Sequence, residues 1–528
     1  MPLKAVRLSG LVTPEDVPAD VSDPGAWTEA SGVNFREGIA ERVAGWREIY
    51  DTTNEPPLHV INNYFDGSNY WLYASDDEIN VTDEGGTHKD ITPAAAPSTG
   101  ADSNIWTSCE LNGLPVLNFG EDYPVYWGRD YGTPTVCATL PDWPANYTAK
   151  VMRAFKYYLV AMNIYGGGTT LPATVKWSDA AAQGIPDDGA GTTWSATAEN
   201  DSGELDLGAT AEGINDGLAL RDEMLICKAH STYKLIYVGG VAVFGQRQFS
   251  ATAGALAANC MAEYRGQMVT LADGDVWITD GQQMRSLVDR RVRRNLFSRL
   301  DVDNFTRSYV VAHPLKHEVW ICIPETGATY PNLALVWNAE TDKLSYRDIS
   351  GGGSGIPHMA PGNISESGLA KTWTTITGTW ATNTNKWSDF NAAEPVNGLV
   401  GVEFDAPNLV LMDTGLTQDT GTINSRLRRE GLDFGDREAV KLVTEFWPRI
   451  TGPAGIQVNI RLGTQDAPED AISWGASSVY TLGTDKFINT RPRGRLISVE
   501  IQSTDISGQW RCTGGDFKLM VAGRYHGK

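Results

Sequence analysis

The sequence predicts an all-β protein with a β-propeller-like body, loop insertions and a C-terminal β-sandwich domain. One observation is a composition rich in turn and aromatic residues, with 55 Gly, 17 Trp and 19 Tyr among 528 residues. Another is a series of short alternating strands joined by turn signals such as Asp66-Gly67 and Asn112-Gly113. The third is the near-constant spacing of these hairpins along the chain.

The hairpin spacing favours propeller blades. Six positions chosen as equivalent points are separated by 44, 43, 67, 44 and 41 residues; they are Tyr70, Leu114, Tyr157, Met224, Met268 and Tyr309. A recurrence near 40 to 45 residues is typical of a four-stranded blade, which cannot bury both faces without a neighbour. An array of β-sandwiches with irregular loops is the alternative interpretation.

Three regions follow from this pattern. Residues 1–50, punctuated by Pro and Gly before Trp27, are predicted to form an extended N-terminal arm. Residues 51–448 are the propeller-like domain, with insertions near 165–217 and 350–395. Residues 449–528 show longer alternating segments and are predicted to form a small independent β-sandwich.

Finer elements are also predicted inside the propeller-like domain. Strands at 399–412 and 426–448 are expected to supply the last blade and close the ring. Helical stripes are scarce, and the best candidates are 251–264 and 286–300.

Charge and cysteine usage restrict the partners and the compartment. The formal net charge of −22 argues against a cationic grip on nucleic acid, although an acidic wall lets DNA pass without sticking. The six cysteines are scattered without a C-x-x-C pair, which favours reduced core thiols. Residues 1–10 lack a signal-peptide core and no run of about 18 apolar residues occurs, so we expect synthesis and assembly in a cytoplasm and no membrane span.

No motif for catalysis or cofactor binding is found. The sequence lacks H-E-x-x-H, a P-loop, a G-x-S-x-G elbow and an EF-hand loop, so the expectation is a structural protein without catalytic residues, cofactor or metal. His313 and His317 lie four apart, but Pro314 argues against a helix and favours a turn. Residues 187–194 resemble the Asp-box turn of sialidase-like propellers with one extra residue, and a Gly-rich turn ending in a buried Trp194 is favoured.

One basic cluster stands out in this acidic chain. Six arginines lie within fifteen residues, from Arg285 to Arg299. A docking contact with an acidic neighbour, or a contact with DNA phosphate, is one interpretation; a solvated, salt-bridged helix face is the other. The predicted contact residues are Arg290, Arg291, Arg293 and Arg294.

The order of several segments resembles the tail nozzle family of short-tailed bacteriophages, also called tail tubular protein B or tail hub. The segments that carry this resemblance are loose structural patterns in the same order; they are SGVNFREGIAERVAGW, ATVKWSDAAA, LRDEMLICKAHSTYKLIYVGG, DGDVWITDGQQMRSLVDRRV, FGDREAVKLVTEFWP and RPRGRLISVEIQS followed by WRCTGGDFKLMVAGR. The resemblance covers most of the chain.

The resemblance implies a virion protein of the tail. Members of this family assemble as rings, commonly hexamers, below the head-to-tail adaptor, and extend the channel through which DNA leaves. It also implies contacts with tail fibres, a role in DNA retention and ejection, and assembly in the host bacterial cytoplasm. The insertions near 165–217 and 350–395 are then candidates for interface or gate elements.

Two alternatives remain open at this point. A propeller glycoside hydrolase would place carboxylates around the axis. A receptor-binding or decoration protein of the virion would use the C-terminal β-domain to bind a host surface.

Overall fold

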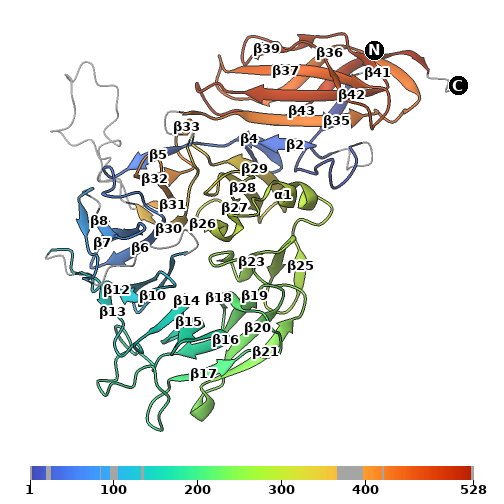
Figure 1. Cartoon of the computed structure of the whole chain (residues 1–528). Coiled ribbons are helices and arrows are strands. Elements are labelled where there is room, and N and C mark those ends of the chain that lie inside the picture. Colours follow the sequence, from blue (N-terminus) through green and yellow to red (C-terminus); the bar gives the residue numbers. More distant parts are fainter. Residues whose placement is uncertain are drawn as a thin grey trace, which may run out of the picture.

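Two β architectures are joined in this protein, a ring of four-stranded sheets and a two-sheet sandwich (Figure 1). The computed structural model describes all residues except 1–2, 20–24, 84, 95–104, 133–135, 352, 365–395, 419–420 and 525–528. Within the described residues one α-helix, α1 (Arg293–Arg299), and two 3-10 helices, η1 (Gly240–Ala242) and η2 (Phe305–Arg307), interrupt the strands. The predicted all-β fold class with a propeller is therefore confirmed.

In the part of the chain that the structure describes, seven antiparallel meanders of four strands form the blades of the propeller. The first five are separate sheets of four consecutive strands. Blades one and two contain β6 (His59–Phe65), β7 (Ser68–Ala74), β8 (Ile79–Asp83), β9 (His88–Asp90), β10 (Thr107–Leu111), β11 (Leu114–Asn118), β12 (Val125–Tyr126) and β13 (Ala138–Thr139). Blades three to five contain β14 (Tyr147–Phe155), β15 (Tyr158–Gly166), β16 (Thr169–Trp177), β17 (Gly203–Asp206), β18 (Ile214–Leu220), β19 (Glu223–Lys228), β20 (Thr232–Tyr237), β21 (Phe244–Ser250), β22 (Met261–Tyr264), β23 (Gln267–Ala272), β24 (Asp275–Thr279) and β25 (Met284–Ser286).

The sixth and seventh blades belong to larger sheets. Their strands are β26 (Tyr309–His313), β27 (Glu318–Ile323), β28 (Leu333–Asn338) and β29 (Lys343–Asp348), then β30 (Met359–Ile364), β31 (Val396–Glu403), β32 (Asn408–Met412) and β5 (Trp46–Ile49). Strand β5 pairs antiparallel with β32, and the short strands β33 (Thr417–Gln418) and β34 (Gly421–Thr422) extend this sheet. A strand from the start of the chain thus completes the last blade and closes the ring.

Tight hairpins set the register within the blades. The turn between β6 and β7 is Asp66-Gly67 and that between β10 and β11 is Asn112-Gly113, and all four residues have positive φ. Positive φ at both central residues is the geometry of the two-residue turn whose twist matches its flanking strands. The predicted hairpin signals are confirmed at both places.

The sandwich consists of two sheets that take strands from both ends of the chain. Its strands are β1 (Leu3–Arg7), β2 (Glu29–Ser31), β3 (Val33–Arg36), β4 (Ile39–Arg42), β35 (Ser425–Leu432), β36 (Ala439–Thr451), β37 (Gln457–Gln465), β38 (Ser473–Trp474), β39 (Ser478–Thr481), β40 (Ile488–Asn489), β41 (Arg493–Gly494), β42 (Leu496–Ser503) and β43 (Arg511–Arg524). One sheet has the order β3-β4-β43-β36-β40, with β1 on β43 and β41 on β36. The other contains β2, β35, β42 and β37 and continues into blade six, because β2 pairs in parallel with β29.

The strand pairing moves the predicted region boundaries. The boundary after residue 448 falls inside β36, and β35 and β36 pair within the sandwich instead of closing the propeller. Residues 1–50 form no separate arm, because β1 to β4 are sandwich strands and β5 is a blade strand. The sandwich is not independent either, since one sheet runs from blade six into it.

Two expectations about spacing are also refined. The chosen points near Tyr70, Leu114, Tyr157, Met224 and Met268 mark the start of the second strand in blades one to five, whereas Tyr309 starts a first strand. The predicted insertion 165–217 contains β16 and β17, so the extra chain is the loop between them. The insertion 350–395 contains β30. Its Trp-rich part falls within residues 365–395, which lie outside the described residues.

The helix expectations are only partly met. Residues 286–300 contain α1, which is shorter than predicted and covers Arg293–Arg299. Residues 251–264 contain a loop and strand β22 instead of a helix. The apolar side chains of this second stretch, such as Ala255 and Met261, are buried between blades, so tertiary packing decides its conformation.

One hydrophobic core links the two architectures. It gathers buried side chains from blade five, blade six and both sandwich sheets, including Val269, Ile321, Val33, Val458 and Phe517. A shared core and a shared sheet oppose motion of the sandwich relative to the propeller. Among the described helices, none is long and apolar enough to cross a membrane.

Candidate functional site

Two adjoining cavities open on one face of the propeller. Their walls come from the segments that lead into inner strands and from the loops between second and third strands of a blade. In an antiparallel meander these segments lie at the same end of the sheet. The cavities have volumes of about 740 and about 660 Å³, and Ile105, Lys150 and Ala258 line both.

The two cavities differ in chemical character. The larger one combines aromatic side chains with Glu121 and Lys150. The other is more apolar, with Phe297 and Val302 beside His230. Concave sites with aromatic walls and a few charged groups suit ligands of mixed polarity, so this face is one candidate binding site.

A belt of polar side chains from the inner strands lies next to these cavities. Arg153 on β14 donates two hydrogen bonds of 2.9 Å to the carboxylate of Asp216 on β18. It also donates to the carbonyl of Ser108 on β10 and to the amide oxygen of Asn259, both at 2.9 Å. Ser108 and His59 share a hydrogen bond of 2.8 Å. We call these five residues the axial belt.

The axial belt crosses the propeller axis. The side-chain amide of Asn259, just before the first strand of blade five, donates a hydrogen bond of 2.9 Å to the carbonyl of Trp106. Trp106 lies just before the first strand of blade two. Arg153 in blade three reaches the same Asn259. Blades two and five are not neighbours in the ring, so these contacts connect opposite sides and fill the axis at this level.

Buried histidines extend the belt to the last blades. The rings of His59 and His358 have centroids 4.0 Å apart, and Tyr309 lies 5.4 Å from His358. Burial, with the nearby charge of Arg153, lowers the pKa of His358 to about 3. Burial and the neighbouring His358 also lower the pKa of His59 well below its usual value. Both rings are therefore neutral near pH 7.

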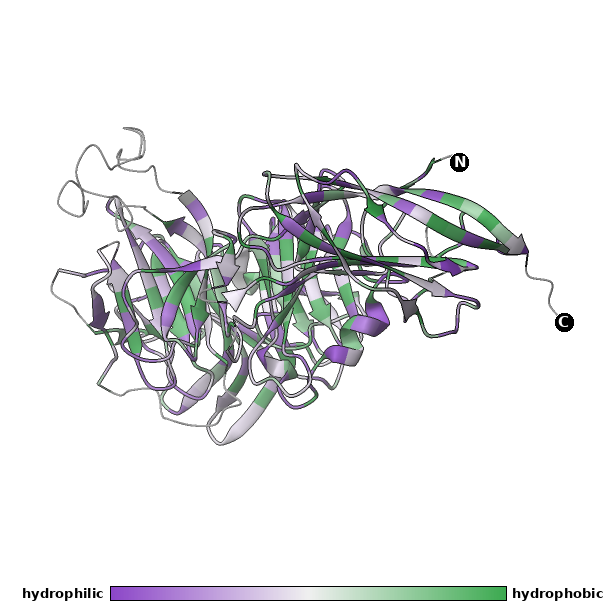
Figure 2. Ribbon diagram, turned by 90° about the horizontal axis from the view of Figure 1, so that it is seen from above, coloured by the Kyte–Doolittle hydropathy of each residue, from purple (hydrophilic) through white to green (hydrophobic). Residues whose placement is uncertain are grey.

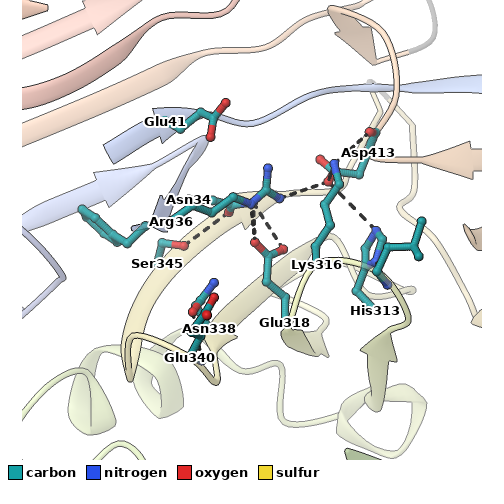
Figure 3. A network of polar contacts seen from close by, with 12 residues as sticks. Asn34, Arg36, Glu41, His313, Lys316, Glu318, Asn338, Glu340, Ser345 and Asp413 are labelled. Atoms are coloured by element: carbon teal, nitrogen blue, oxygen red, sulfur yellow. Dashed lines mark hydrogen bonds and ion pairs between the residues drawn. The ribbon is translucent and has the colours of Figure 1, made fainter. Parts of the chain in front are cut away.

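A second buried polar network lies where the propeller meets the sandwich, and we call it the joint (Figure 3). Asp413, which directly follows β32, pairs with Arg347 of β29 at 3.0 Å and with Arg36 of β3 at 3.1 Å. The ammonium of Lys316 also contacts this carboxylate. Arg36 donates a further 2.8 Å hydrogen bond to Glu318 on β27. The joint therefore ties blades six and seven to the first sandwich strands.

The two carboxylates of the joint have opposite pKa shifts. Although burial opposes ionisation of Asp413, the cations Arg347, Lys316 and Arg36 lower its pKa far below the usual value. Burial dominates at Glu318 and raises its pKa despite Arg36. Burial also lowers the pKa of His313, which lies beside Asp413, to about 4. Of the two carboxylates, Asp413 is thus the one whose charged form its neighbours favour more strongly.

The structure places the four predicted contact arginines beside the fifth blade. Arg291 pairs with Asp342 at 2.7 Å, and Arg293 donates a hydrogen bond of 2.7 Å to the carbonyl of Gly274. Arg290 and Arg294 are exposed, and the backbone N–H of Arg294 donates to Asp16. Arg291 is thus held within the chain, and Arg293 also lies 3.6 Å from the carboxylate of Asp275. A contact of the exposed arginines with a partner stays a prediction.

The loop that resembles an Asp-box is held together internally. Asp188 accepts hydrogen bonds from the backbone N–H groups of Ala190, Gly191 and Thr192, and Trp194 is buried. The hydroxyl of Thr192, which donates to this carboxylate, lowers the pKa of Asp188 to about 2. Asp142, Asp187 and Asp188 bring carboxylate oxygens within 4.8 Å of one another. Loop geometry accounts for Asp188, and the turn with a buried Trp is confirmed.

The remaining sequence predictions concern His313, His317 and the cysteines. His313 ends β26 and His317 immediately precedes β27, so the predicted turn is confirmed. All six cysteines are free, and five are buried. Burial raises the pKa of Cys109, the partly buried one, to about 12. Five of the six cysteines are thus core residues, as predicted, and Cys109 is half-buried.

The comparisons with known proteins assign the chain to no family. No protein-family model matches the chain, and no curated protein matches it either. Among solved structures, one match is described as "AfRom2 CNH domain", with a TM-score of 0.34 and 8% sequence identity. The match covers 71% of this chain and 99% of that domain.

Sequence reasoning missed both the axial belt and the joint. Belt residues come from positions 59 to 259 and joint residues from positions 36 to 413, so no local motif contains either set. One weak signal existed, because His59, Ser108 and Asp216 are polar residues within the first three positions of the first strands of their blades. A polar residue thus recurs at that place in blades one, two and four.

Proposed function

We propose that this chain is a tail nozzle protein of a short-tailed bacteriophage virion, and that several copies form a ring around the DNA exit channel. The observation that carries the proposal is the fusion of propeller and sandwich through one sheet and one core. A subunit without an internal hinge is suited to a stiff wall. In this proposal the ring, six copies by resemblance, lies below the head-to-tail adaptor and contacts tail fibres.

The closed propeller axis supports a channel between copies. Arg153 and Asn259 fill the axis, so DNA would have to pass through a lumen shared by the ring. The net charge of −22 favours such a lumen, because an acidic wall repels phosphate and leaves DNA free to slide. Retention and ejection of DNA would then depend on the shape of the lumen rather than on sequence-specific binding of DNA.

The arginine cluster is the proposed contact for another tail component. Arg290, Arg293 and Arg294 present accessible guanidinium groups on an acidic protein. Guanidinium groups pair well with carboxylates and phosphates. The acidic net charge makes a protein surface, such as that of the adaptor, a better partner than DNA.

Gold labelling of the chain in intact particles tests the proposal. We expect label on the tail axis, beyond the adaptor, and particles lacking the chain should lose packaged DNA. Label on the head or tail periphery would contradict the proposal and favour a decoration protein. Release of sugars from host glycans, abolished by substitution of a single cavity carboxylate such as Glu121→Gln, would instead favour a hydrolase.

A further inference from the structure

The far end of the sandwich carries a basic and apolar surface, which we call the sandwich tip. It consists of residues 3–7, 433–441, 491–495 and 518–524, brought together by strand pairing of β1 and β36 with β43 and of β41 with β36. Figure 2 shows strands of the sandwich projecting beyond the rest of the molecule toward the C-terminus. Nine Lys and Arg but three Asp and Glu lie in these four segments, in a chain with 43 and 65 overall.

Cations at the sandwich tip remain available for a partner. Arg491, Arg493 and Arg524 are exposed, and no ion pair joins them to a carboxylate within the described part of the chain. Two other cations there are neutralised: Lys518 pairs with Glu445 at 2.6 Å and Arg437 with Asp433 at 3.3 Å. The unpaired arginines therefore give the sandwich tip its positive charge.

Apolar side chains are exposed on both sides of the sandwich tip. Met520 and Val521 are neighbours in β43, so their side chains point to opposite faces of the sheet. They are 39% and 58% exposed, and Leu3 on the adjacent strand β1 is 54% exposed. Elsewhere in β43, Cys512 and Phe517 are buried. Exposed apolar residues ringed by charge are typical of a protein contact.

A complementary surface lies at the other end of the same chain. Residues 178–206 contain seven Asp and Glu and no Lys or Arg. They include the long loop between β16 and β17, where Asp187, Glu199 and Asp201 are exposed. We call these residues the acidic segment; Figure 1 shows blade three, which contains it, at the opposite end of the molecule from the sandwich.

We infer that the sandwich tip of one copy docks on the acidic segment of a second copy. Complementary surfaces at opposite ends of one chain make head-to-tail contacts, and such contacts close into a ring when the rotation allows it. This inference rests on the proposed function and assigns the contact between neighbouring subunits. The exposed Met520 and Val521 favour a protein partner over DNA, because phosphate recognition leaves no role for them.

Charge reversal in the full-length chain tests the inference. We expect the purified parent chain to self-associate in sedimentation velocity, more weakly as NaCl is raised. The double variant Arg491→Glu/Arg493→Glu, and separately Asp187→Lys/Glu199→Lys, should each weaken self-association by at least about tenfold. An equimolar mixture of the two variants should restore association. The negative sandwich tip of the first variant can then pair with the positive segment of the second, and the unchanged surfaces can pair with each other.

Matched controls separate this contact from general charge effects. Arg247→Glu/Arg265→Glu changes two exposed arginines on blades four and five and should leave self-association unchanged. Val521→Glu should weaken it, whereas Val479→Glu, at a 55% exposed position on β39 outside the sandwich tip, should not. Circular dichroism of each variant confirms that the β fold is retained.

Three results would overturn the inference. They are a parent chain that stays monomeric at all concentrations, reversed variants that associate as well as the parent, and a mixture that fails to restore association. Binding of duplex DNA lost on Arg491→Glu/Arg493→Glu, with self-association intact, would also overturn it. If particles show the chain as an axial ring that these reversals leave intact, the inference fails while the proposed function stands.

Discussion

The axial belt and the joint bury charge in two different ways. In the belt, Arg153 and Asp216 form a one-to-one pair, and neutral groups satisfy the rest. In the joint, Asp413 faces three cations, while burial raises the pKa of the second carboxylate, Glu318. The belt connects blades that repeat along the chain, whereas the joint connects segments that are far apart in sequence.

This difference indicates different roles for the two networks. In the axial belt, a buried ion pair whose hydrogen bonds are all satisfied can fill the centre of the propeller without leaving a net charge there. A carboxylate that holds cations from β3 and β29 and from the turn before β27 requires one arrangement of all these elements. We therefore expect the joint, more than the belt, to fix the sandwich against the propeller.

The largest expected effect comes from removing the charge of Asp413. Asp413→Asn leaves three cations without their shared carboxylate, and breaking a buried ion pair costs about 3–5 kcal/mol. Chemical denaturation followed by Trp fluorescence measures the loss. Asp222→Asn, at a 98% exposed carboxylate, is the control and should leave the denaturation midpoint unchanged. Equal midpoints for the two variants would contradict the role of Asp413.

A smaller loss is expected for the axial belt. Arg153→Met removes the cation from Asp216, but the backbone N–H groups of Gly217 and Asn259 still donate to that carboxylate at 2.7 Å. We expect destabilisation of about 2–3 kcal/mol in the same assay. Arg247→Met, at an exposed arginine, is the matched control. A loss larger than that of Asp413→Asn would reverse the ranking of the two networks.

Acid should destabilise the protein through its buried histidines. The folded pKa of His358 is about 3 and that of His313 about 4, both below the usual 6.5. The unfolded chain therefore binds more protons between pH 6.5 and 4, and stability falls as pH falls through this range. At pH 5 each such histidine lowers the unfolding free energy by about 2 kcal/mol.

His358→Gln tests this pH dependence. The variant should lose about 2 kcal/mol less than the parent between pH 7 and pH 5, measured by denaturation at each pH. His230 is the contrasting case, because its hydrogen bond with Glu212 raises its pKa, so His230→Gln should not flatten the profile. A parent chain equally stable at both pH values would contradict the assignment of neutral buried rings.

The smallest effect is expected at Glu318. Its raised pKa shows that burial disfavours its charge, so Glu318→Gln removes a cost along with the pairing to Arg36. Arg36 keeps Asp413 as a partner at 3.1 Å. The two changes offset, and we expect less than about 1 kcal/mol in the denaturation assay. A loss as large as that of Asp413→Asn would show that the joint depends equally on both carboxylates.

The blades were predictable from the sequence because each is a local unit. Hairpin turns such as Asn112-Gly113 and alternating strands specify a meander within about 40 residues. The strands that complete the fold were not predictable from the sequence. Strand β5 pairs with β32 and β2 pairs with β29, and the partners are more than 300 residues apart in each case. Short strands such as β2 carry no signal for a distant partner. The predictions of an N-terminal arm and of an independent C-terminal sandwich were therefore wrong.

The candidate sites were predictable to a lesser extent. The arginine cluster is contiguous in sequence, so its position was evident, although its internal contacts, such as that of Arg291 with Asp342, were not. The cavities and both buried networks arise when loops and strand ends of different blades meet. Their charged members, among them Asp216 and Asp413, resemble surface carboxylates until the fold surrounds them.

A double-mutant cycle between Asp413 and Arg347 tests most directly whether the joint acts through its charge. The two groups are 3.0 Å apart, and both side chains are almost fully buried. Asp413→Asn, Arg347→Met and the double variant are compared by denaturation with the parent chain. We predict that the double variant loses about 2 kcal/mol less than the sum of the single losses. Losses that simply add would contradict a charge-coupled joint between propeller and sandwich.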